Sequence, residues 1–172
     1  QGFQEHFLWD EMLLEIRHMM EEELDYRQEA ANMRKFRKAL KKHRVYVPKV
    51  FRRHCTEKLL VMEFLDGVFM SEYLKVLRKD PAKVMHWNAQ NNINPEKVAK
   101  RLLNSMLRQL YEDRLFHGDL HPGNIMVLKK NRLALIDFGN VGLFDADFAM
   151  QHDQFSRAMA KGQIAKAADI YI

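Results

Sequence analysis

The stretch FHGDLHPGNIMV (Phe116 to Val127) places four polar side chains between two apolar runs. They are His117, Asp119, His121 and Asn124. A packed core does not favour so many polar groups together, because each buried one needs a hydrogen-bond partner. Two glycines and a proline in the same stretch add residues that favour turns. The stretch therefore predicts a loop with a chemical function.

A short hairpin is expected after this loop. Ile125 to Leu128 predicts one strand, KKNR a turn, and Leu133 to Ile136 a second strand. The second strand runs directly into DFGNVG, which begins at Asp137. Because a hairpin returns the chain to its start, we expect Asn124 and Asp137 to lie side by side.

The side chains around this hairpin suit phosphoryl transfer. Mg²⁺ prefers hard oxygen ligands, and Asn124 and Asp137 offer an amide oxygen and a carboxylate. Asp119 lies further back along the loop, where a free carboxylate can accept a proton from an attacking hydroxyl. One base and two metal ligands around a phosphate are the minimum set for this reaction. The order also matches HRDxxxxN and DFG in protein kinases, with Gly118 in place of the arginine.

Single motifs also have other interpretations. Asp-Phe-Gly alone is a common turn tripeptide. His117, Asp119 and His121 alternate as ligands of a zinc or iron site can, although this interpretation leaves Asn124 and Asp137 unused. We expect His121 instead to order the loop through hydrogen bonds with the backbone.

The remaining pattern predicts an α+β fold. From Phe3 to about Arg44 the residues favour two helices or one bent helix. The expected elements are a helix near Tyr26 to Lys41, neighbouring antiparallel strands at Val45 to Phe51 and Lys58 to Phe64, a helix at Ser71 to Leu77, a loop at Asn88 to Pro95, and a long amphipathic helix from Pro95 to about Asp113. Further helices are expected at the end of the chain.

Charge and cysteine content limit the class of protein. A chain of 172 residues suits one domain, and the single cysteine, Cys55, excludes an internal disulfide and agrees with a reducing compartment. The net charge is +5, and much of it lies in RKFRKALKKHR (Arg34 to Arg44). Such a run is typical of a solvated helix face, yet it also suits acidic phospholipid or a phosphorylated ligand. Aromatic residues do not alternate with the basic ones, so no nucleic-acid partner is expected.

Several motifs, in order along the chain, carry a family resemblance. ELDYRQEAAN begins at Glu23, and VPKVF, LVMEFLDG, HGDLHPGN and LIDFGNVG follow it. Over Glu23 to about Phe144 they resemble the UbiB/AarF family of atypical kinases, which is associated with coenzyme Q biosynthesis. Small-molecule kinases of the aminoglycoside and choline type would share only the last two motifs.

The resemblance implies a partial protein-kinase-like fold that binds ATP or ADP with Mg²⁺. Residues 1–172 would form a single kinase-like domain fragment. About 1–64 would be the end of the N-lobe, with a helix and two strands, and 65–172 the first part of the helical C-lobe with the catalytic hairpin. Asp119 then takes the catalytic-base position, and Asn124 and Asp137 take the metal positions.

The resemblance also implies roles for residues upstream of the loop. Glu29 corresponds to the helix glutamate that pairs with the phosphate-binding lysine. Glu23 and Asp25 correspond to the family's ExD pair, which contacts an N-terminal extension, although an acidic cluster at a helix start is favoured by the helix dipole alone. Met62 takes the gatekeeper position, and Glu63 to Leu65 the hinge whose backbone pairs with adenine.

Some parts of the family pattern are absent from this sequence. No lysine occurs before Lys35, so the partner of Glu29 is missing, as are the phosphate loop and the KxGQ segment. We expect these parts to precede Gln1 in a longer protein. We therefore expect this fragment by itself to bind nucleotide poorly and to be inactive.

The predicted function is that of an ATP- and Mg²⁺-dependent atypical kinase or ATPase that supports ubiquinone biosynthesis. The expected partners are ATP or ADP, lipid intermediates or enzymes of quinone biosynthesis, and an anionic membrane surface in peripheral contact. The compartment stays open between mitochondrion, plastid and the bacterial cytoplasm with its inner membrane. A small-molecule phosphotransferase and a nucleotide-sensing scaffold without phosphoryl transfer are the alternatives.

Overall fold

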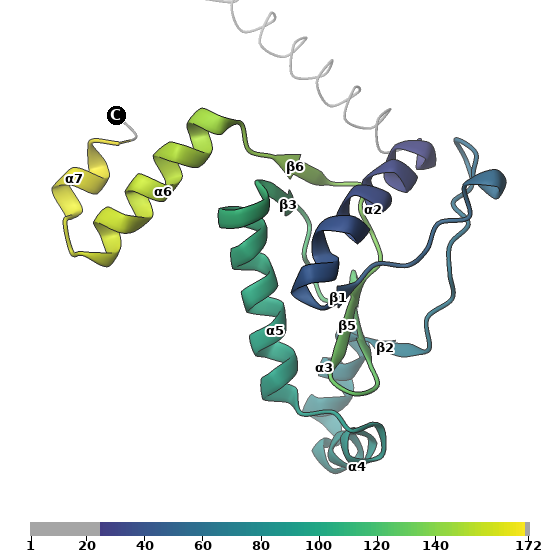
Figure 1. Cartoon of the computed structure of the whole chain (residues 1–172). Helices are drawn as coiled ribbons and strands as arrows, with labels where there is room; N and C mark the ends of the chain where they lie inside the picture. Colours follow the sequence, from purple (N-terminus) through teal and green to yellow (C-terminus); the bar gives the residue numbers. More distant parts are fainter. Residues whose placement is uncertain (1–24, 171–172) are drawn as a thin grey trace, which may run out of the picture.

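The computed structural model describes residues 25–170 (Figure 1). Its helices are α2 (Tyr26–Leu40), α3 (Met70–Lys79), α4 (Pro81–Asn91), α5 (Pro95–Arg108), α6 (Ala146–Ala160) and α7 (Ile164–Ala168), with 3₁₀ turns η1 (Lys41–His43) and η2 (Arg52–His54) and a π-helical turn η3 (Gln109–Asp113). The strands are β1 (Val45–Tyr46), β2 (Gly67–Phe69), β3 (Leu115–His117), β4 (Ile125–Leu128), β5 (Arg132–Leu135) and β6 (Val141–Leu143). Within residues 25–170, no helix combines the length and the hydrophobicity needed to span a membrane.

The predicted hairpin lies at the centre of the main sheet. That sheet has four strands in the order β1-β5-β4-β2, and a second sheet pairs β3 with β6. β4 and β5 are antiparallel, with Ile125 opposite Leu135 and Leu128 opposite Arg132. β2 adds to β4 in antiparallel direction, and β1 adds to β5 in parallel direction. Strands from distant parts of the chain thus converge on one hairpin.

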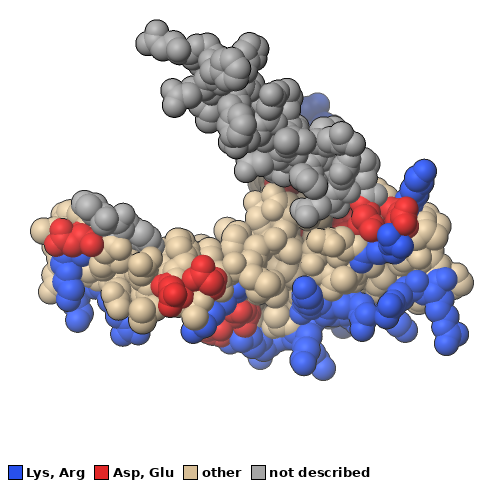
Figure 2. Space-filling model, turned by 90° about the horizontal axis from the view of Figure 1, so that it is seen from above, with Lys and Arg blue, Asp and Glu red and all other residues tan. Residues whose placement is uncertain are grey.

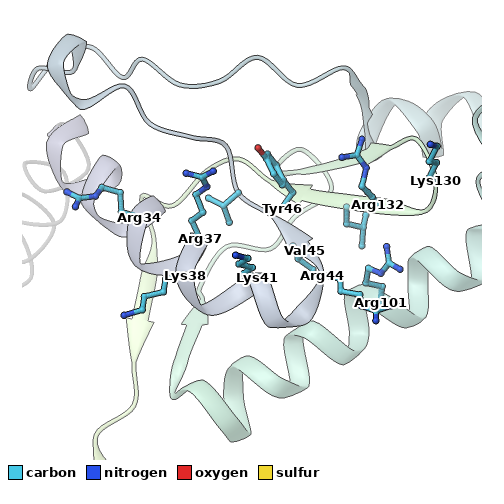
Figure 3. A pocket seen from close by; sticks show the side chains of 12 residues that line it. Arg34, Arg37, Lys38, Lys41, Arg44, Val45, Tyr46, Arg101, Lys130 and Arg132 are labelled. Atoms are coloured by element: carbon cyan, nitrogen blue, oxygen red, sulfur yellow. The ribbon is translucent and has the colours of Figure 1, made fainter.

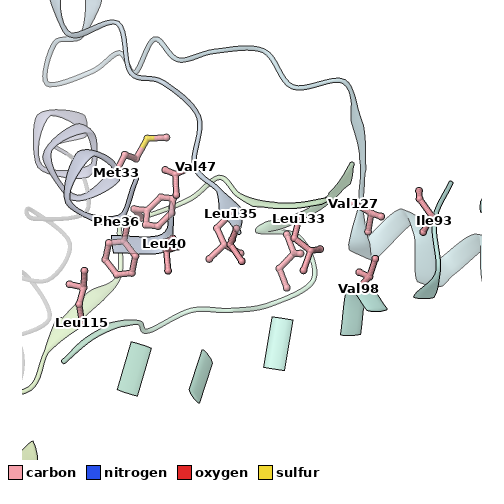
Figure 4. Packing of buried hydrophobic residues seen from close by; sticks show 13 residues of the cluster. Met33, Phe36, Leu40, Val47, Ile93, Val98, Leu115, Val127, Leu133 and Leu135 are labelled. Carbon is pink, nitrogen blue, oxygen red and sulfur yellow. The ribbon is translucent and has the colours of Figure 1, made fainter. Parts of the chain in front are cut away.

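Helix α2 confirms the helix predicted near Tyr26 to Lys41. Asp25 caps its start, where its carboxylate accepts a hydrogen bond from the backbone N–H of Arg27 at 2.9 Å. Met33, Phe36 and Leu40 recur at helical spacing, and all three have no exposed surface. They pack against the buried residues of the hairpin and of β1 in one cluster (Figure 4).

Helix α5 lies beside the hairpin (Figure 1) and confirms the long helix predicted from Pro95. Asn94 caps it, and the Asn94 N–H donates to the side chain of Asn131 in the β4–β5 turn. The α-helix ends at Arg108, and the last predicted residues continue as the π-helical turn η3. This turn leads into β3 and so into the predicted functional loop.

The two predicted N-lobe strands are shorter than the sequence indicates. Of the first run only Val45–Tyr46 is a regular strand, and it pairs with β5. Pro48 interrupts the ladder because it has no backbone N–H. Residues 58–64 form no regular strand and meet the first run through one antiparallel bridge, between Val50 and Met62. The prediction that these two runs are antiparallel neighbours is therefore confirmed, and the predicted strand lengths are wrong.

The loop predicted at Asn88 to Pro95 is wrong in its first half. Asp80 caps the start of helix α4, and the helix continues through Asn91. The side chain of Asn91 donates to the Trp87 carbonyl one turn earlier. The side chain of Asn88 is buried and donates to the Tyr73 hydroxyl at 2.9 Å. The helix ends at Asn92 in the left-handed conformation, with φ of 53°.

We expect Phe36→Ala to lower the free energy of unfolding by about 3–5 kcal/mol, because it leaves a cavity in the core between α2 and the hairpin. Phe64→Ala removes the same ring from a position that is 91% exposed. This control should change stability by no more than about 0.5 kcal/mol. Urea unfolding of the full-length protein and both variants measures the difference, and equal losses would contradict the described core.

Candidate active site

The loop from His117 to Asn124, called here the HGD loop, is held between the two sheets. β3 enters it and β4 leaves it. The β3–β6 pairing places His117 opposite Val141, and the Gly118 N–H donates to the Asn140 carbonyl at 3.0 Å. The segment before Asp119 is therefore bound to the segment after Asp137.

The absence of a side chain at Gly118 has a structural reason. A Cβ atom at this position would lie 2.6 Å from Oδ1 of Asn140. The position occupied by arginine in the protein-kinase motif is therefore used here for close contact between the HGD loop and the DFGNVG segment.

Asn124 is buried, and its amide group has a defined orientation. Its Nδ2 donates to the Asp119 carbonyl at 3.0 Å, which leaves its oxygen Oδ1 as the atom available to a ligand. The Ile136 N–H donates to the Asn124 carbonyl at 3.1 Å and closes the open end of the hairpin. Asn124 thus pairs with the residue before Asp137, so the hairpin returns the chain to its start as the sequence predicted.

His117 connects the two predicted functional segments. Its Nε2 lies 2.6 Å from the Asp137 carbonyl oxygen, which can only accept, so Nε2 carries the proton. Its Nδ1 therefore accepts the backbone N–H of Asp119, at 3.2 Å. Both ring nitrogens are engaged in the protein. This arrangement disfavours the zinc or iron interpretation of the histidine row.

The Asp119 carboxylate points away from these backbone contacts. It is about half exposed, with a side-chain exposure of 55%, and its Oδ2 lies 3.8 Å from Nε2 of His121. His121 Nδ1 accepts the Gly123 N–H at 3.0 Å, so His121 orders the loop through the backbone as predicted. The loop backbone is thus held in place while the Asp119 carboxylate stays accessible to a substrate.

Helix α2 holds the segment that carries Asp137. Glu29 Oε1 accepts the Phe138 N–H at 3.2 Å, and Asn32 Nδ2 donates to the Phe138 carbonyl at 3.0 Å. Burial raises the pKa of Glu29, and the nearby Asp137 adds to that effect, while the bond from Phe138 opposes it. Glu29 is thus a partly buried carboxylate whose charged form is disfavoured by its surroundings.

The Phe138 ring completes this connection in the core. It is fully buried, and its centroid lies 4.9 Å from that of Phe36 and 5.2 Å from that of His117. The side chain next to the candidate metal ligand therefore packs between α2 and the HGD loop. Movement of α2 would therefore displace the Phe36, Phe138 and His117 rings together.

Two positioning residues were not found by sequence reasoning. The side chain of Asn32, one helical turn beyond Glu29, donates a hydrogen bond to the Phe138 carbonyl. The second residue is Gln109 in η3, which is 2% exposed. Gln109 Oε1 accepts the His117 N–H at 3.2 Å. Only their polar character on the apolar face of a predicted helix could have indicated them, because their partners lie in other elements of the fold.

The predicted hinge residues lie apart from the HGD loop. The Glu63 carboxylate accepts the Tyr46 hydroxyl at 2.7 Å and the Lys49 N–H at 3.0 Å, and these bonds lower its pKa. Met62 is partly exposed, and Leu65 packs against the outer side of the β4–β5 hairpin. The Glu63 side chain is thus tied to β1 and to the segment that follows it, and the contacts of Leu65 are with the hairpin.

Asp25 does not join the candidate site. Its carboxylate caps α2 and pairs with Arg27 at 3.0 Å, which lowers its pKa. Arg27 pairs in turn with Glu57 at 2.7 Å. This contact agrees with the helix-start interpretation of the acidic cluster. Glu23, the other member of the predicted ExD pair, lies outside the described residues.

The donor set fits a hard divalent cation. Asn124 Oδ1 and the Asp137 carboxylate are oxygen donors on adjoining segments of the hairpin, and oxygen donors of this kind are the ligands that Mg²⁺ prefers. One oxygen of Asp137 accepts the Gly139 N–H at 3.0 Å, which orients the carboxylate and leaves its second oxygen available. Among residues 25–170 no three His, Cys, Asp or Glu side chains gather in a group that would hold a metal ion.

Comparison with known proteins identifies the family. A model of the ABC1 atypical kinase-like domain matches residues 1–170. This chain belongs to the ABC1 atypical kinase-like family. The predicted resemblance to UbiB/AarF kinases is confirmed.

Relatives of this ABC1 domain include kinases of plants and bacteria. The protein ACTIVITY OF BC1 COMPLEX KINASE 1, chloroplastic, of Arabidopsis thaliana is 37% identical over 123 residues, covering 71% of this chain and 16% of the plant protein. A probable protein kinase UbiB of Aeromonas hydrophila is 32% identical over 142 residues, covering 80% of this chain and 24% of that protein. The chain thus spans a quarter or less of the length of these two relatives.

A solved structure has the same fold. Rv3197 from Mycobacterium tuberculosis, determined as a complex with erythromycin, superposes with a TM-score of 0.61 at 28% identity. The match covers 92% of this ABC1 domain and 37% of that chain. The predicted α+β, partial protein-kinase-like fold is therefore confirmed.

The protonation of His117 should make stability depend on pH. Burial lowers its pKa, more strongly than the bond to the Asp137 carbonyl raises it. The unfolded chain then binds this proton more tightly, so the stabilisation is complete above the ordinary histidine pKa of about 6.5 and is lost as pH falls below it. We expect His117→Gln to flatten the acid side of the stability profile measured by urea unfolding.

His86→Gln is the matched control for this experiment, because His86 is exposed on α4. This variant should keep the acid-dependent loss of the parent protein. A profile that is unchanged in His117→Gln would show that His117 does not require its neutral form in the folded state.

Proposed function

We propose that this ABC1 domain belongs to an ATP- and Mg²⁺-dependent atypical kinase or ATPase. The observation that carries the proposal is the fixed amide of Asn124, whose nitrogen is bonded to the Asp119 carbonyl and whose backbone pairs with Ile136, the residue before Asp137. A base, an amide oxygen and a carboxylate are thereby held on one rigid backbone unit. This is the arrangement that phosphoryl transfer needs, because positioning and charge neutralisation dominate its catalysis.

Asn124 and Asp137 would hold the Mg²⁺ ion, which neutralises charge on the phosphates of a bound nucleotide. The other tasks, which are orientation of the attacking group and acceptance of its proton, would fall to residues of this chain. Asp119 would orient the attacking hydroxyl or water and accept its proton, since its carboxylate is exposed and its backbone is held by His117 and Asn124. His117 holds the loop against the Asp137 carbonyl and takes no part in proton transfer.

Glu29 would pair with a phosphate-binding lysine outside this sequence. Support comes from its position, because the Glu29 carboxylate is partly buried and accepts the Phe138 N–H, in the residue next to Asp137. A lysine there would stabilise the charged form of Glu29. The pair would couple α2 to the nucleotide, because α2 also holds both backbone groups of Phe138.

The adenine contacts and the lobe boundary are part of the same proposal. Met62 would be the gatekeeper, and the backbone of Glu63 to Leu65 would pair with adenine between an N-lobe part at about 1–64 and a C-lobe part at 65–172. The connection of this segment into β2, which pairs with β4, supports the placement. Glu23 and Asp25 would contact the N-terminal extension implied by the family resemblance.

The proposed biological role is support of ubiquinone biosynthesis. It rests on the family resemblance and on relatives named as probable UbiB kinases. Lipid intermediates or enzymes of quinone biosynthesis are the proposed partners of the whole protein. Peripheral contact with an anionic membrane through the basic residues of α2 stays a prediction.

We expect Mg²⁺ with ATP to raise the melting temperature of the full-length protein, and Asp137→Asn to abolish this rise. The substitution removes the charge that holds the cation but keeps a similar shape. Asp153→Asn on α6, away from the hairpin, serves as the matched control and should keep the rise. No stabilisation in the parent protein would contradict a metal-nucleotide site.

We expect Asp119→Asn to lower turnover of ATP by roughly 10²–10⁴-fold while the affinity for Mg-ATP stays within a factor of a few, because the base is lost and the metal ligands remain. Turnover and equilibrium binding are measured on the same full-length preparation. If cellular function survives this substitution, the protein acts as a nucleotide-sensing scaffold instead.

A further inference from the structure

A cleft rich in basic residues lies on the side of the β4–β5 hairpin where α2 passes. Its volume is about 760 Å³. The basic lining residues are Arg34, Arg37, Lys38, Lys41, Arg44, Arg101, Lys130 and Arg132. Figure 3 shows that they come from α2, the α2–β1 connection, α5 and the hairpin. Four separate parts of the fold thus present positive charge to one hollow.

The floor of the cleft is apolar and rigid. Val45 and Val47 are 4% and 1% exposed, and Leu133 has no exposed surface. Val45 pairs with Leu133 in the parallel β1–β5 ladder. The volume lies within the range of small-molecule sites, which is about 300–1,000 Å³. A bound molecule would therefore meet a preformed surface.

Arg37 lies near the Glu63 carboxylate, but several of the other cations in the cleft have no carboxylate partner among the described residues. Elsewhere carboxylates pair with basic side chains, as Asp113 does with Lys42 and Glu112 with Arg108. Among the described residues, no carboxylate pairs with Lys38, Lys41 or Lys130, and all three are exposed.

The arginines at the far wall of the cleft are held by the hairpin turn. Arg101 donates to the Asn131 carbonyl, and Arg132 donates to the Lys129 carbonyl at 3.3 Å. Neither contact neutralises the guanidinium charge. Figure 2 shows Lys and Arg side chains gathered along one edge of the molecule. Cations crowded in this way repel one another, and an anion would relieve that repulsion.

The cleft is separate from the candidate active site. Lys130 and Arg132 lie at the turn of the hairpin, and Asn124 and Asp137 flank its open end. Four paired residues lie between the two ends, which corresponds to roughly 13 Å of strand. A single phosphate group cannot contact both.

We propose that this basic cleft binds a soluble ligand with two or more phosphate groups. Arginine forks and lysine ammonium groups from several elements match the oxygens of neighbouring phosphates. A concave site with an apolar floor suits a small molecule better than a flat bilayer surface, where the cations would have to lie on a common plane. The occupant would connect α2 to the hairpin turn, at the end of α2 opposite Glu29.

The test titrates inorganic pyrophosphate into the full-length protein in EDTA, with calorimetry as the readout, so that no metal site contributes. We expect saturable binding that is at least tenfold weaker in the triple variant Lys38→Gln, Lys41→Gln, Lys130→Gln. The control triple variant Lys35→Gln, Lys83→Gln, Lys97→Gln removes the same charge from exposed lysines outside the cleft and should keep the affinity.

Two outcomes would overturn the proposal. They are an absence of pyrophosphate binding to the parent protein and an equal loss of affinity in both triple variants. Vesicles of equal parts phosphatidylcholine and phosphatidylglycerol test the other source of phosphate. If the cleft variant loses vesicle binding and pyrophosphate does not bind the parent protein, the cleft serves a membrane surface instead. Because the titration needs neither metal nor turnover, its result is independent of the proposed kinase activity.

Discussion

β4 and β5 pair in one antiparallel register, and the position of every candidate active-site group depends on it. The register puts Ile125 opposite Leu135, so the next bond along joins the Ile136 N–H to the Asn124 carbonyl. A slip of one residue would move the side chains of one strand to the other face of the sheet, because side chains alternate along a strand. The buried residues on both strands prevent such a slip, since each would lose its place in the core.

Helix α2 connects this hairpin to the rest of the domain. Its apolar side supplies Met33, Phe36 and Leu40 to the core. Glu29 accepts the backbone N–H of Phe138, and Asn32 donates to the backbone carbonyl of the same residue. Its opposite side supplies cations to the basic cleft. One helix thus contacts the DFGNVG segment near its start and the cleft near its end, so a ligand at either place would restrict the same element.

The HGD loop shows how a polar segment is accommodated in a packed domain. His117 is buried, yet each of its ring nitrogens has a partner, and its backbone N–H bonds to Gln109. Gln109 reaches it because the π-helical turn changes the direction of side chains at the end of α5. The Asp119 carboxylate is left outside this network, where it is free to meet a substrate.

The local pattern of the sequence determined the elements closest to the functional loop. Short apolar runs on either side of a turn predicted the hairpin, helix-favouring residues predicted α2 and α5, and the return of a hairpin placed Asn124 near Asp137. These inferences succeeded because they depend on neighbours in sequence. The strand predicted at 58–64 failed for the opposite reason, since a strand needs a partner, and Pro48 and the parallel pairing of β1 with β5 left it only one bridge.

Tertiary structure alone decided the rest. The bonds from Asn32 and Gln109 to the backbone of the candidate active site join separate elements, and the sequence around each residue does not identify its partner. The same holds for the basic cleft. The sequence showed a run of cations on one helix, but only the fold added Arg101, Lys130 and Arg132 to it. Charges from separate elements form a site only when packing of the apolar faces brings those elements together.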